Sequence, residues 1–354
     1  MSDRDLLSRV SVTCPAPRHA WNDILANDDN ALPDQTPAWL DTICAAGGHE
    51  EASRLYVFLD GRRFVLPLVR RGGPTGAGGW LSSYPPAWGI GGVLGAGIDR
   101  DVTATVLADL RRVAAARIWI RPDPLQAPLW SPSIAPSFTT RAIARRAHVL
   151  DLTGDLDRAL ARMSDSTRQH IRQARRRVTR VETDCTGRLL PMHYELYLTS
   201  VQRWAQRQHE PRLLAIWRAK QRDDLHKLQT MARHLGEAMV VQVAFVGDRP
   251  AASNITLLGR TAHDIRAAID ISVASWSRAA TILQWTAIQL AHAHGCTRLH
   301  LGESGDSTGV STFKERFGAT AIPYTEFRIE RLPYTLVGRA LRSGVKRLLG
   351  VNDM

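Results

Sequence analysis

The sequence predicts an α/β fold with a mixed sheet, because the same order of elements occurs in both halves of the chain. A helix, a two-strand meander, a second helix and a short strand follow one another twice. Residues 54–70 alternate apolar and polar side chains around an Asp-Gly turn at 60–61, and residues 238–258 do so around a Gly-Asp turn at 247–248. Such alternation about a two-residue turn is typical of a β-hairpin.

The first half begins with a predicted helix at Trp39–Gly47, ahead of the first meander. A helix at Asp101–Ala116 and a strand at Arg117–Arg121 follow the meander. Five prolines between Pro122 and Pro136 indicate a loop. We therefore expect a first domain over residues 1–145.

The second half begins with a strand at Arg145–Leu152 and helices over residues 155–235. The helix that starts at Asp155 could be two, because Asp165-Ser166 could interrupt it. Residues 188–208 and 211–235 predict an antiparallel helical pair, inserted in or appended to the domain. We assign residues 146–335 to this second domain and residues 336–354 to a basic helical tail.

The segment from Arg298 to Arg331 carries the strongest functional indication. It predicts a buried strand at Arg298–Leu301, a glycine-rich loop at Gly302–Gly309, a short helix and a closing strand at Ala321–Glu330. Loops at such edges hold ligands over a rigid scaffold. Lys314 lies in the short helix, where a fixed cation could stabilise an anion that appears only during a reaction.

The composition excludes several classes of protein. Hydrophobic residues make up 44% and charged residues 23% of the chain, as in globular domains, and no apolar run is long enough to span a membrane. The N-terminus lacks the apolar core of a signal peptide, and four scattered cysteines suit a reducing compartment, so we expect a cytoplasmic protein. No histidine or cysteine spacing predicts a metal site, and no GxSxG motif predicts a serine triad.

The chain is strongly basic, with a net charge of +12 and a pI near 10.3. This balance favours a polyanionic partner, such as nucleic acid, a nucleotide-linked substrate or a membrane surface. An arginine-rich genome would produce the same balance without such a partner. Four arginines share one broad helix face and could bind phosphates, or that face could simply be solvated. They are Arg168, Arg172, Arg175 and Arg176.

Several motifs together resemble a known family. The stretch Phe313-Lys314 followed by Phe317-Gly318 resembles the closing segment of the GNAT-fold transferases of the FemAB type and their CelD-like acetyltransferase relatives. Residues 35–40, 64–68 and 166–174 resemble other motifs of these proteins in the same order. The resemblance covers most of residues 30–335. It implies tandem GNAT-like domains, one working cleft, and transfer of an acyl group to an amine.

The resemblance leaves two acyl donors open. FemAB-type enzymes use aminoacyl-tRNA, whereas the CelD-like relatives are thought to use acyl-CoA. Acetyl-CoA users carry a (Q/R)xxGxG/A loop whose backbone N–H groups hold the pyrophosphate. The corresponding residues 271–280 contain no glycine. We therefore expect aminoacyl-tRNA as co-substrate, with no other cofactor and with a small-molecule or nucleotide-linked amine as acceptor.

Two alternatives remain at this point. One is an acyl-CoA-dependent N-acyltransferase that acts on an amino sugar or an amino acid. The other is a non-catalytic RNA-binding protein, which the basic helix fits and the Phe-Lys loop does not.

The resemblance also implies roles for individual residues. Lys314 would stabilise the tetrahedral oxyanion of aminolysis, and Asp270 or Glu303 could act near the reacting carbonyl or take the proton of the amine. A strand-end turn and a solvated loop are the alternatives for these two carboxylates. Five further residues are predicted to contact substrate. They are Phe313, Trp276, Arg278, Tyr84 and Trp88. For Tyr84 and Trp88, aromatic packing in the core is the alternative.

Overall fold

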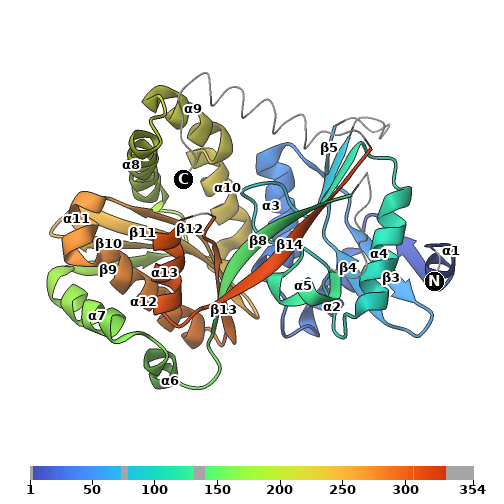
Figure 1. Cartoon of the computed structure of the whole chain (residues 1–354), viewed down its shortest axis with the longest axis horizontal. Helices are drawn as coiled ribbons and strands as arrows, with labels where there is room; N and C mark the ends of the chain where they lie inside the picture. The colour runs from blue at the N-terminus through green and yellow to red at the C-terminus, as the bar shows by residue number, and fades with distance from the viewer. Residues whose placement is uncertain (1–2, 73–78, 131–139, 306, 332–354) are drawn as a thin grey trace. The chain divides into compact units, whose positions relative to one another are not determined.

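The computed structural model describes residues 3–72, 79–130, 140–305 and 307–331, which form two compact units. Unit 1 contains the described residues up to Ala147 and from Ile322 onward, and unit 2 contains His148 to Ala321. Strands β8 (Thr140–Asp151) and β14 (Thr320–Glu330) each contribute residues to both units (Figure 1). The domain limits expected from the sequence stay predictions, and the expected tail at 336–354 lies outside the described residues.

Unit 1 contains two groups of strands. The first sheet has the order β1-β3-β4, and the other group runs in the order β2-β5-β6-β7-β14. Their bounds are Val10–Thr13 (β1), Glu50–Glu51 (β2), Arg54–Phe58 (β3), Arg63–Leu66 (β4), Val69–Arg71 (β5), Trp80–Ser82 (β6) and Arg117–Ile120 (β7). The predicted hairpin is confirmed, because β3 and β4 pair antiparallel across a turn in which Gly61 has a φ of 86°.

The helices of unit 1 pack on an apolar core. They are α1 (Asp3–Leu7), α2 (Arg18–Ala26), α3 (Pro37–Gly47), α4 (Arg100–Arg112) and α5 (Ala127–Trp130), with short 3₁₀ turns at Pro33–Gln35 and Pro124–Gln126. Helix α3 begins at Pro37, two residues before the predicted Trp39, because the Thr36 hydroxyl caps it by accepting the Trp39 N–H. In the core, the Trp130 ring stacks on Phe327 at 6.3 Å, so β14 supplies part of the core of unit 1.

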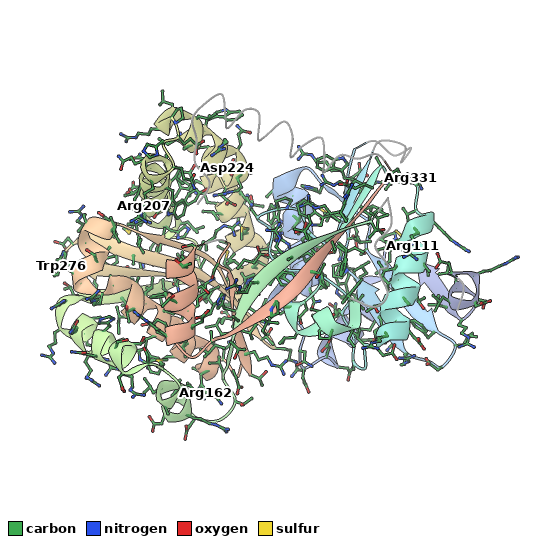
Figure 2. The ribbon with its side chains drawn as sticks, in the orientation of Figure 1. Arg111, Arg162, Arg207, Asp224, Trp276 and Arg331 are labelled. Carbon is green, nitrogen blue, oxygen red and sulfur yellow. The ribbon has the colours of Figure 1, made fainter. Side chains whose placement is uncertain are left out.

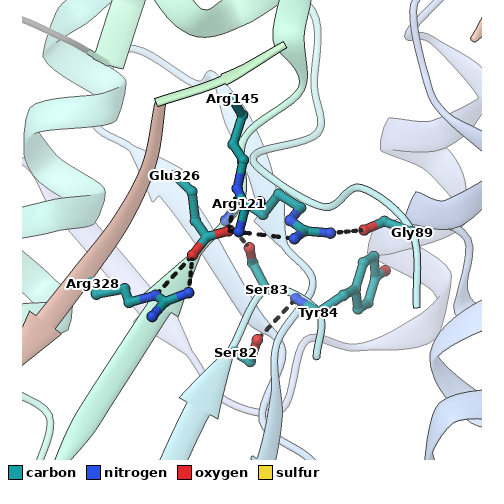
Figure 3. A network of polar contacts seen from close by, with 8 residues as sticks. All are labelled: Ser82, Ser83, Tyr84, Gly89, Arg121, Arg145, Glu326 and Arg328. Carbon is teal, nitrogen blue, oxygen red and sulfur yellow. Dashed lines mark hydrogen bonds and ion pairs between the residues drawn. The ribbon is translucent and has the colours of Figure 1, made fainter. Parts of the chain in front are cut away.

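Unit 1 also contains a buried ionic network around Glu326, which is fully buried on β14 (Figure 3). Its carboxylate lies 3.3 Å from the Arg121 guanidinium, 3.1 Å from that of Arg145 and 2.7 Å from that of Arg328. Arg121 additionally donates to the carbonyl of Gly89 at 3.3 Å. Three arginines of this unit therefore share one carboxylate that water does not reach.

The sheet of unit 2 is mixed. Strands β9 (Arg180–Asp184), β10 (Met239–Val246), β11 (Arg249–Leu258) and β12 (Ala262–Ile269) pair antiparallel in sequence order, and β13 (Arg298–Glu303) pairs parallel with β12. Among the described residues, the β12–β13 ladder contains two pairs, Ala262 with Leu299 and His263 with His300. The carboxyl-terminal parts of these two strands therefore have no ladder between them.

Helices cover both faces of this sheet (Figure 1). Helix α12 packs on one face and α8 on the other, each over its own apolar cluster. The bounds are Leu156–Ala161 (α6), Asp165–Arg177 (α7), Leu190–Arg207 (α8), Arg212–Arg222 (α9), Leu225–Leu235 (α10), Ile271–Ser277 (α11), Ala279–Ala293 (α12) and Thr308–Arg316 (α13), with a 3₁₀ turn at Gly236–Ala238.

For the helical segments of unit 2, the structure confirms one alternative that the sequence left open and corrects one expectation. The segment that starts at Asp155 forms two helices, since Ser164 caps α7 by accepting the Thr167 N–H. The segment 211–235 also forms two helices, so the expected pair is in fact three helices, α8, α9 and α10. The break lies at Asp223, because Asp224 caps α10 while Asp223 turns inward to bind Lys227 at 2.7 Å.

The predicted α/β fold with a mixed sheet is confirmed. None of the helices within the described ranges combines the length and the apolar composition that crossing a lipid bilayer requires.

Candidate functional site

Unit 2 contains a cleft of about 440 Å³ at the outer ends of four helices. Helices α7, α11, α12 and α13 and the end of β12 all contribute to its walls. The lining residues are Thr167, His170, Ile269, Ile271, Ala274, Ser275, Arg278, Ala280, Thr281, Thr308, Gly309, Thr312, Phe313, Arg316 and Phe317. The cleft is large enough to hold part of a nucleotide or an acyl chain.

The charge of the cleft is positive. His170, Arg278 and Arg316 line it, and no aspartate or glutamate is among the lining residues. The pKa of His170 is lowered by desolvation and then by the positive charges of Arg278 and Arg316. This repulsion means that the His170 ring lies near both guanidinium groups, and the positive charge of the cleft comes from Arg278 and Arg316. Such a cleft favours an anionic ligand over a neutral one.

Arg278 holds a backbone conformation that is unusual for its type. Its φ of 62° lies in the left-handed region, where it ends α11 and immediately precedes α12. A left-handed residue other than glycine costs about 1–2 kcal/mol. Its Nε atom is buried and has no hydrogen-bond partner among the described residues. Arg278 also marks the start of α12, which carries the positive end of the helix dipole. Ala280 and Thr281, in the first turn of α12, line the cleft.

Lys314 lies on a different face of α13 from the residues that line the cleft. Thr312, Phe313 and Arg316 face the cleft. Because an α-helix has 3.6 residues per turn, position 314 lies on a different face from these three. The Lys314 side chain is buried, and its Nζ donates to the carbonyls of Gly302 at 3.1 Å and Glu303 at 2.8 Å. Lys314 thus binds the end of β13, beyond the ladder with β12.

Burial makes the Lys314 ammonium more acidic than usual. Desolvation lowers its pKa to about 8, against the opposing effects of Asp264 and Glu303. Two of the three N–H groups donate to carbonyls, and the third has no acceptor among the residues that the structure describes. Asp264, which sequence reasoning missed, is partly buried on β12 and accepts from Gln284 at 2.6 Å. Burial raises the pKa of Asp264. The ammonium is therefore enclosed rather than exposed to bulk solvent.

The two predicted catalytic carboxylates have other partners. Asp270 caps α11 by accepting the Ser272 N–H at 3.0 Å and pairs with Arg249. Although desolvation raises its pKa, the bonds from Ser272 and Arg249 dominate, so the pKa of Asp270 is lowered. Glu303 contributes its backbone carbonyl to Lys314. The catalytic roles of both stay predictions. Asp306, in the same loop as Glu303, lies outside the described residues.

The five residues expected to contact substrate fall in different places. Phe313 and Arg278 line the cleft. Trp276 is 51% exposed on α11 at the edge of the ribbon and is not among the cleft-lining residues (Figure 2). Tyr84 and Trp88 are buried in unit 1, where Trp88 packs edge-on against Trp39 at 5.9 Å. This is core packing, and substrate contact by Tyr84, Trp88 or Trp276 stays a prediction.

The four arginines of α7 differ from one another. Arg168 donates to the carbonyls of Leu160, Ala161 and Met163 and pairs with Asp165, so it secures the turn between α6 and α7. Arg172, Arg175 and Arg176 are exposed, and none has an ion pair within the described part of the chain. Phosphate binding by the four stays a prediction.

The structure brings together a polar cluster that the sequence did not indicate. His148 of β8 is fully buried, and its ring lies within hydrogen-bond distance of Ser304, Ser311 and Glu315. Because Ser304 is 156 residues from His148 along the chain, no local motif could have identified this cluster. Among the described residues, no group of three histidine, cysteine, aspartate or glutamate side chains has a metal-binding arrangement.

Comparison with known proteins agrees with this architecture. Residues 165–315 match the family model described as the acetyltransferase (GNAT) domain. The chain is similar to the crystal structure of FemX, at a TM-score of 0.64 and 13% identity over 92% of this chain and 98% of the other.

A conserved protein of unknown function from Bacteroides thetaiotaomicron is similar at a TM-score of 0.51 and 12% identity, over 89% of this chain and 99% of the other. No curated protein sequence matches the chain significantly. Residues 165–315 thus match the GNAT domain model, and the fold of the chain is similar to that of FemX.

Proposed function

We propose that this protein is an acyltransferase that forms an amide bond, taking an aminoacyl group from aminoacyl-tRNA and delivering it to an amine. The acceptor would be a small-molecule or nucleotide-linked amine. The GNAT domain match supports acyl transfer as the reaction class. The choice of donor rests on the chemistry of unit 2.

The observation that carries the proposal is the positive cleft of unit 2. His170, Arg278 and Arg316 surround it without a lining carboxylate, and the amino-terminal end of α12 adds its dipole. Phosphate is the anion that such a set of donors binds well. Both aminoacyl-tRNA and acyl-CoA are acyl donors that carry phosphate groups.

Two features favour aminoacyl-tRNA over acyl-CoA. The turn before α12 contains Arg278 where a diphosphate-binding turn would have glycine, so a bulky side chain fills the space next to the backbone N–H groups. Helix α7 also carries the exposed arginines 172, 175 and 176 beyond the cleft. A long polyanion can contact those arginines as well as the cleft, whereas CoA has few phosphates to offer.

Lys314 would supply the electrostatic part of the mechanism. When the amine attacks the acyl carbonyl, the carbonyl oxygen becomes negative in a tetrahedral intermediate. A preorganised ammonium group near this oxygen stabilises it more than it stabilises the substrate. Its two carbonyl partners fix the ammonium in place, and its third N–H can donate to the oxyanion.

The donor can be identified by incubating the protein with charged total tRNA and, separately, with acetyl-CoA, each with a mixture of amines. We expect loss of the aminoacyl ester and formation of an amide, both abolished by ribonuclease. The same loss with Lys314→Met would contradict the role of the lysine. Stable aminoacyl-tRNA over the whole incubation would contradict the donor.

The second candidate is an acyl-CoA-dependent N-acyltransferase acting on an amino sugar or an amino acid, which the match to an acetyltransferase domain favours. It predicts a rise in melting temperature on titration with free CoA, and thiol release in the acetyl-CoA incubation. Salt-sensitive binding of RNA without turnover of either donor would instead identify a non-catalytic RNA-binding protein.

A further inference from the structure

The cluster around His148 has the connectivity of a nucleophile, a base and an orienting carboxylate. The Ser304 hydroxyl lies 3.2 Å from His148 Nδ1, and His148 Nε2 lies 3.1 Å from the Ser311 hydroxyl and 3.4 Å from Glu315 Oε1. The Ser311 hydroxyl also lies 2.7 Å from Glu315 Oε1. All four residues belong to unit 2.

In a neutral ring, the hydrogen bonds of His148 favour one nitrogen as the carrier of the proton. An ionised carboxylate only accepts, so the Ser311 hydroxyl donates to Glu315. Since that proton is used, Nε2 of His148 must donate to the Ser311 oxygen. Nδ1 then has a lone pair and accepts the proton of the Ser304 hydroxyl. This tautomer makes Nδ1 the base and Ser304 the group that it can activate.

The backbone presents Ser304 at a sharp connection between a strand and a helix. Strand β13 ends at Glu303, Ser304 follows, and α13 begins at Thr308. Gly302 and Gly305 flank the serine with φ values of 68° and 52°, which few other residues adopt. Nucleophilic serines of hydrolases are held on such strand-to-helix turns. Here the turn lacks the second glycine of the GxSxG motif, so a search for that motif does not find it.

The surroundings suit the chemistry of a nucleophile. His148 is fully buried, so water does not compete for its ring, whereas Ser304 is only partly buried and reagents can reach it. Lys314 Nζ lies 2.8 Å from the carbonyl of Glu303, the residue before Ser304. A cation held one peptide away from the nucleophile lowers the energy of negative charge that develops there.

We propose that Ser304, His148 and Glu315 form a catalytic set that accepts an acyl group as an ester on Ser304 and releases it to water or to an amine. Ser304 Oγ would attack the carbonyl carbon of an activated ester while its proton moves to His148 Nδ1. The bond to the leaving oxygen then breaks, and that oxygen takes the proton from His148. Attack by water or an amine, with His148 again accepting the proton, forms the acid or the amide as the bond to Ser304 Oγ breaks, and His148 returns the proton to that oxygen.

Glu315 and Ser311 act through His148 and are positioning residues. They hold the ring in the tautomer that leaves Nδ1 unprotonated and stabilise the imidazolium that forms during attack. This activity needs only an activated ester. It therefore does not depend on the phosphate-bearing donor proposed above, and either proposal can fail without the other.

The test is covalent labelling with an alkyl fluorophosphonate, followed by mass spectrometry of the intact protein and its peptides. The serine oxygen forms a bond to phosphorus, fluoride leaves, and His148 takes the proton. We expect one adduct, on Ser304, and release of nitrophenol from p-nitrophenyl acetate. Ser304→Ala should lose the adduct, while Ser11→Ala, a change at an exposed serine of unit 1, should keep it.

The positioning role is tested with Glu315→Gln and Glu315→Asp, which change a half-exposed side chain. We expect Glu315→Gln to slow labelling by about tenfold or more with an unchanged melting temperature, and Glu315→Asp to recover part of the rate. His148→Gln should abolish labelling in the fraction that folds. Equal labelling of wild type and Ser304→Ala, or wild-type rates in both Glu315→Gln and His148→Gln, would overturn the proposal.

Discussion

Two arginine-rich regions of this chain differ in whether carboxylates neutralise their cations. In unit 1, Arg121, Arg145 and Arg328 surround the buried carboxylate of Glu326. In unit 2, Arg278 and Arg316 line an open cleft, and neither has an ion pair among the described residues. The high arginine content is therefore partly structural, and only the cations without carboxylate partners indicate a ligand.

Two buried lysines among the described residues of unit 2 show a similar contrast. Burial lowers the pKa of both Lys227 and Lys314 to about 8. Lys227 binds the carboxylate of Asp223 at 2.7 Å, whereas Lys314 binds backbone carbonyls. A shifted pKa alone does not distinguish a structural lysine from a catalytic one, but the partner does.

The largest expected effect on stability concerns the ionic network around Glu326 in unit 1. Glu326→Gln would remove the buried carboxylate that three partly buried guanidinium groups share, and should lower the free energy of unfolding by about 3–5 kcal/mol, measured by urea unfolding. Glu182→Gln is the control, since this carboxylate also pairs with two arginines, Arg180 and Arg188, but its side chain is 29% exposed whereas that of Glu326 is fully buried. We expect no measurable loss there. Equal losses of unfolding free energy in the two variants would show that burial does not determine the cost of removing the carboxylate.

The largest expected effect on activity concerns Lys314, whose ammonium binds backbone carbonyls. Lys314→Met should lower kcat by a factor on the order of 10²–10³, as removal of an oxyanion donor does. Lys227→Met is the matched control, because it removes an equally buried ammonium from the same unit. It should reduce stability and leave kcat of the folded enzyme near wild type. A similar fall of kcat in Lys314→Met and Lys227→Met would contradict the assignment of Lys314 as catalytic and Lys227 as structural.

The lowered pKa of Lys314 predicts a pH dependence with opposite signs for activity and stability. Above a pH of about 8 the ammonium loses its proton, so kcat should fall toward tenfold per pH unit. The unfolded chain keeps this proton up to its ordinary pKa of 10.5, so the lysine's contribution to the free energy of unfolding rises between those values. Lys314→Arg should remove the alkaline fall if it retains activity. A flat profile of wild-type kcat from pH 7 to 9.5 would contradict the role.

A smaller effect is expected at the left-handed residue of the cleft. Arg278→Gly removes a cation that faces the ligand and should raise KM for the donor about tenfold, while relief of backbone strain keeps the melting temperature unchanged or higher. His209→Gly is the control, because this exposed residue has a φ of 54° away from the cleft. It should gain the same stability without a change in KM. An unchanged KM in Arg278→Gly would exclude the arginine from binding.

The smallest effect concerns the surface of α7. Arg175→Gln should lower the slope of log affinity for RNA against log salt by about 0.7 if this arginine contacts a phosphate. Arg111→Gln in unit 1 is the control, since Arg111 pairs with Asp3 at 3.3 Å. Its slope should match that of wild type. The same slope in all three proteins would assign the exposed face of α7 to solvent.

The fold followed from local features of the sequence. The turns at Gly61 and Gly247 predicted both hairpins, and the alternation on either side fixed their registers. The missed break at Asp223 has a different cause, because that residue leaves the helix to pair with Arg266, 43 residues away. Helical periodicity contains no information about such a partner.

The site was less predictable because its geometry depends on distant residues and on backbone conformation. The Phe-Lys motif located Lys314, but its position on α13 relative to Phe313 separates the lysine from the cleft wall. His148 and Ser304 meet only because β8 and the loop after β13 are brought together by the fold. The left-handed conformation of Arg278 was not predictable, since arginine rarely adopts it.

Strand β14 has a consequence for synthesis on the ribosome. The amino-terminal unit obtains Phe327 for its core and Glu326 for its arginines from a segment translated more than 170 residues after Ala147. Until that segment emerges, the edge of β7 that pairs with it lacks its partner strand. The nascent chain therefore completes its first unit last, and a chaperone that shields open strand edges would act during this interval.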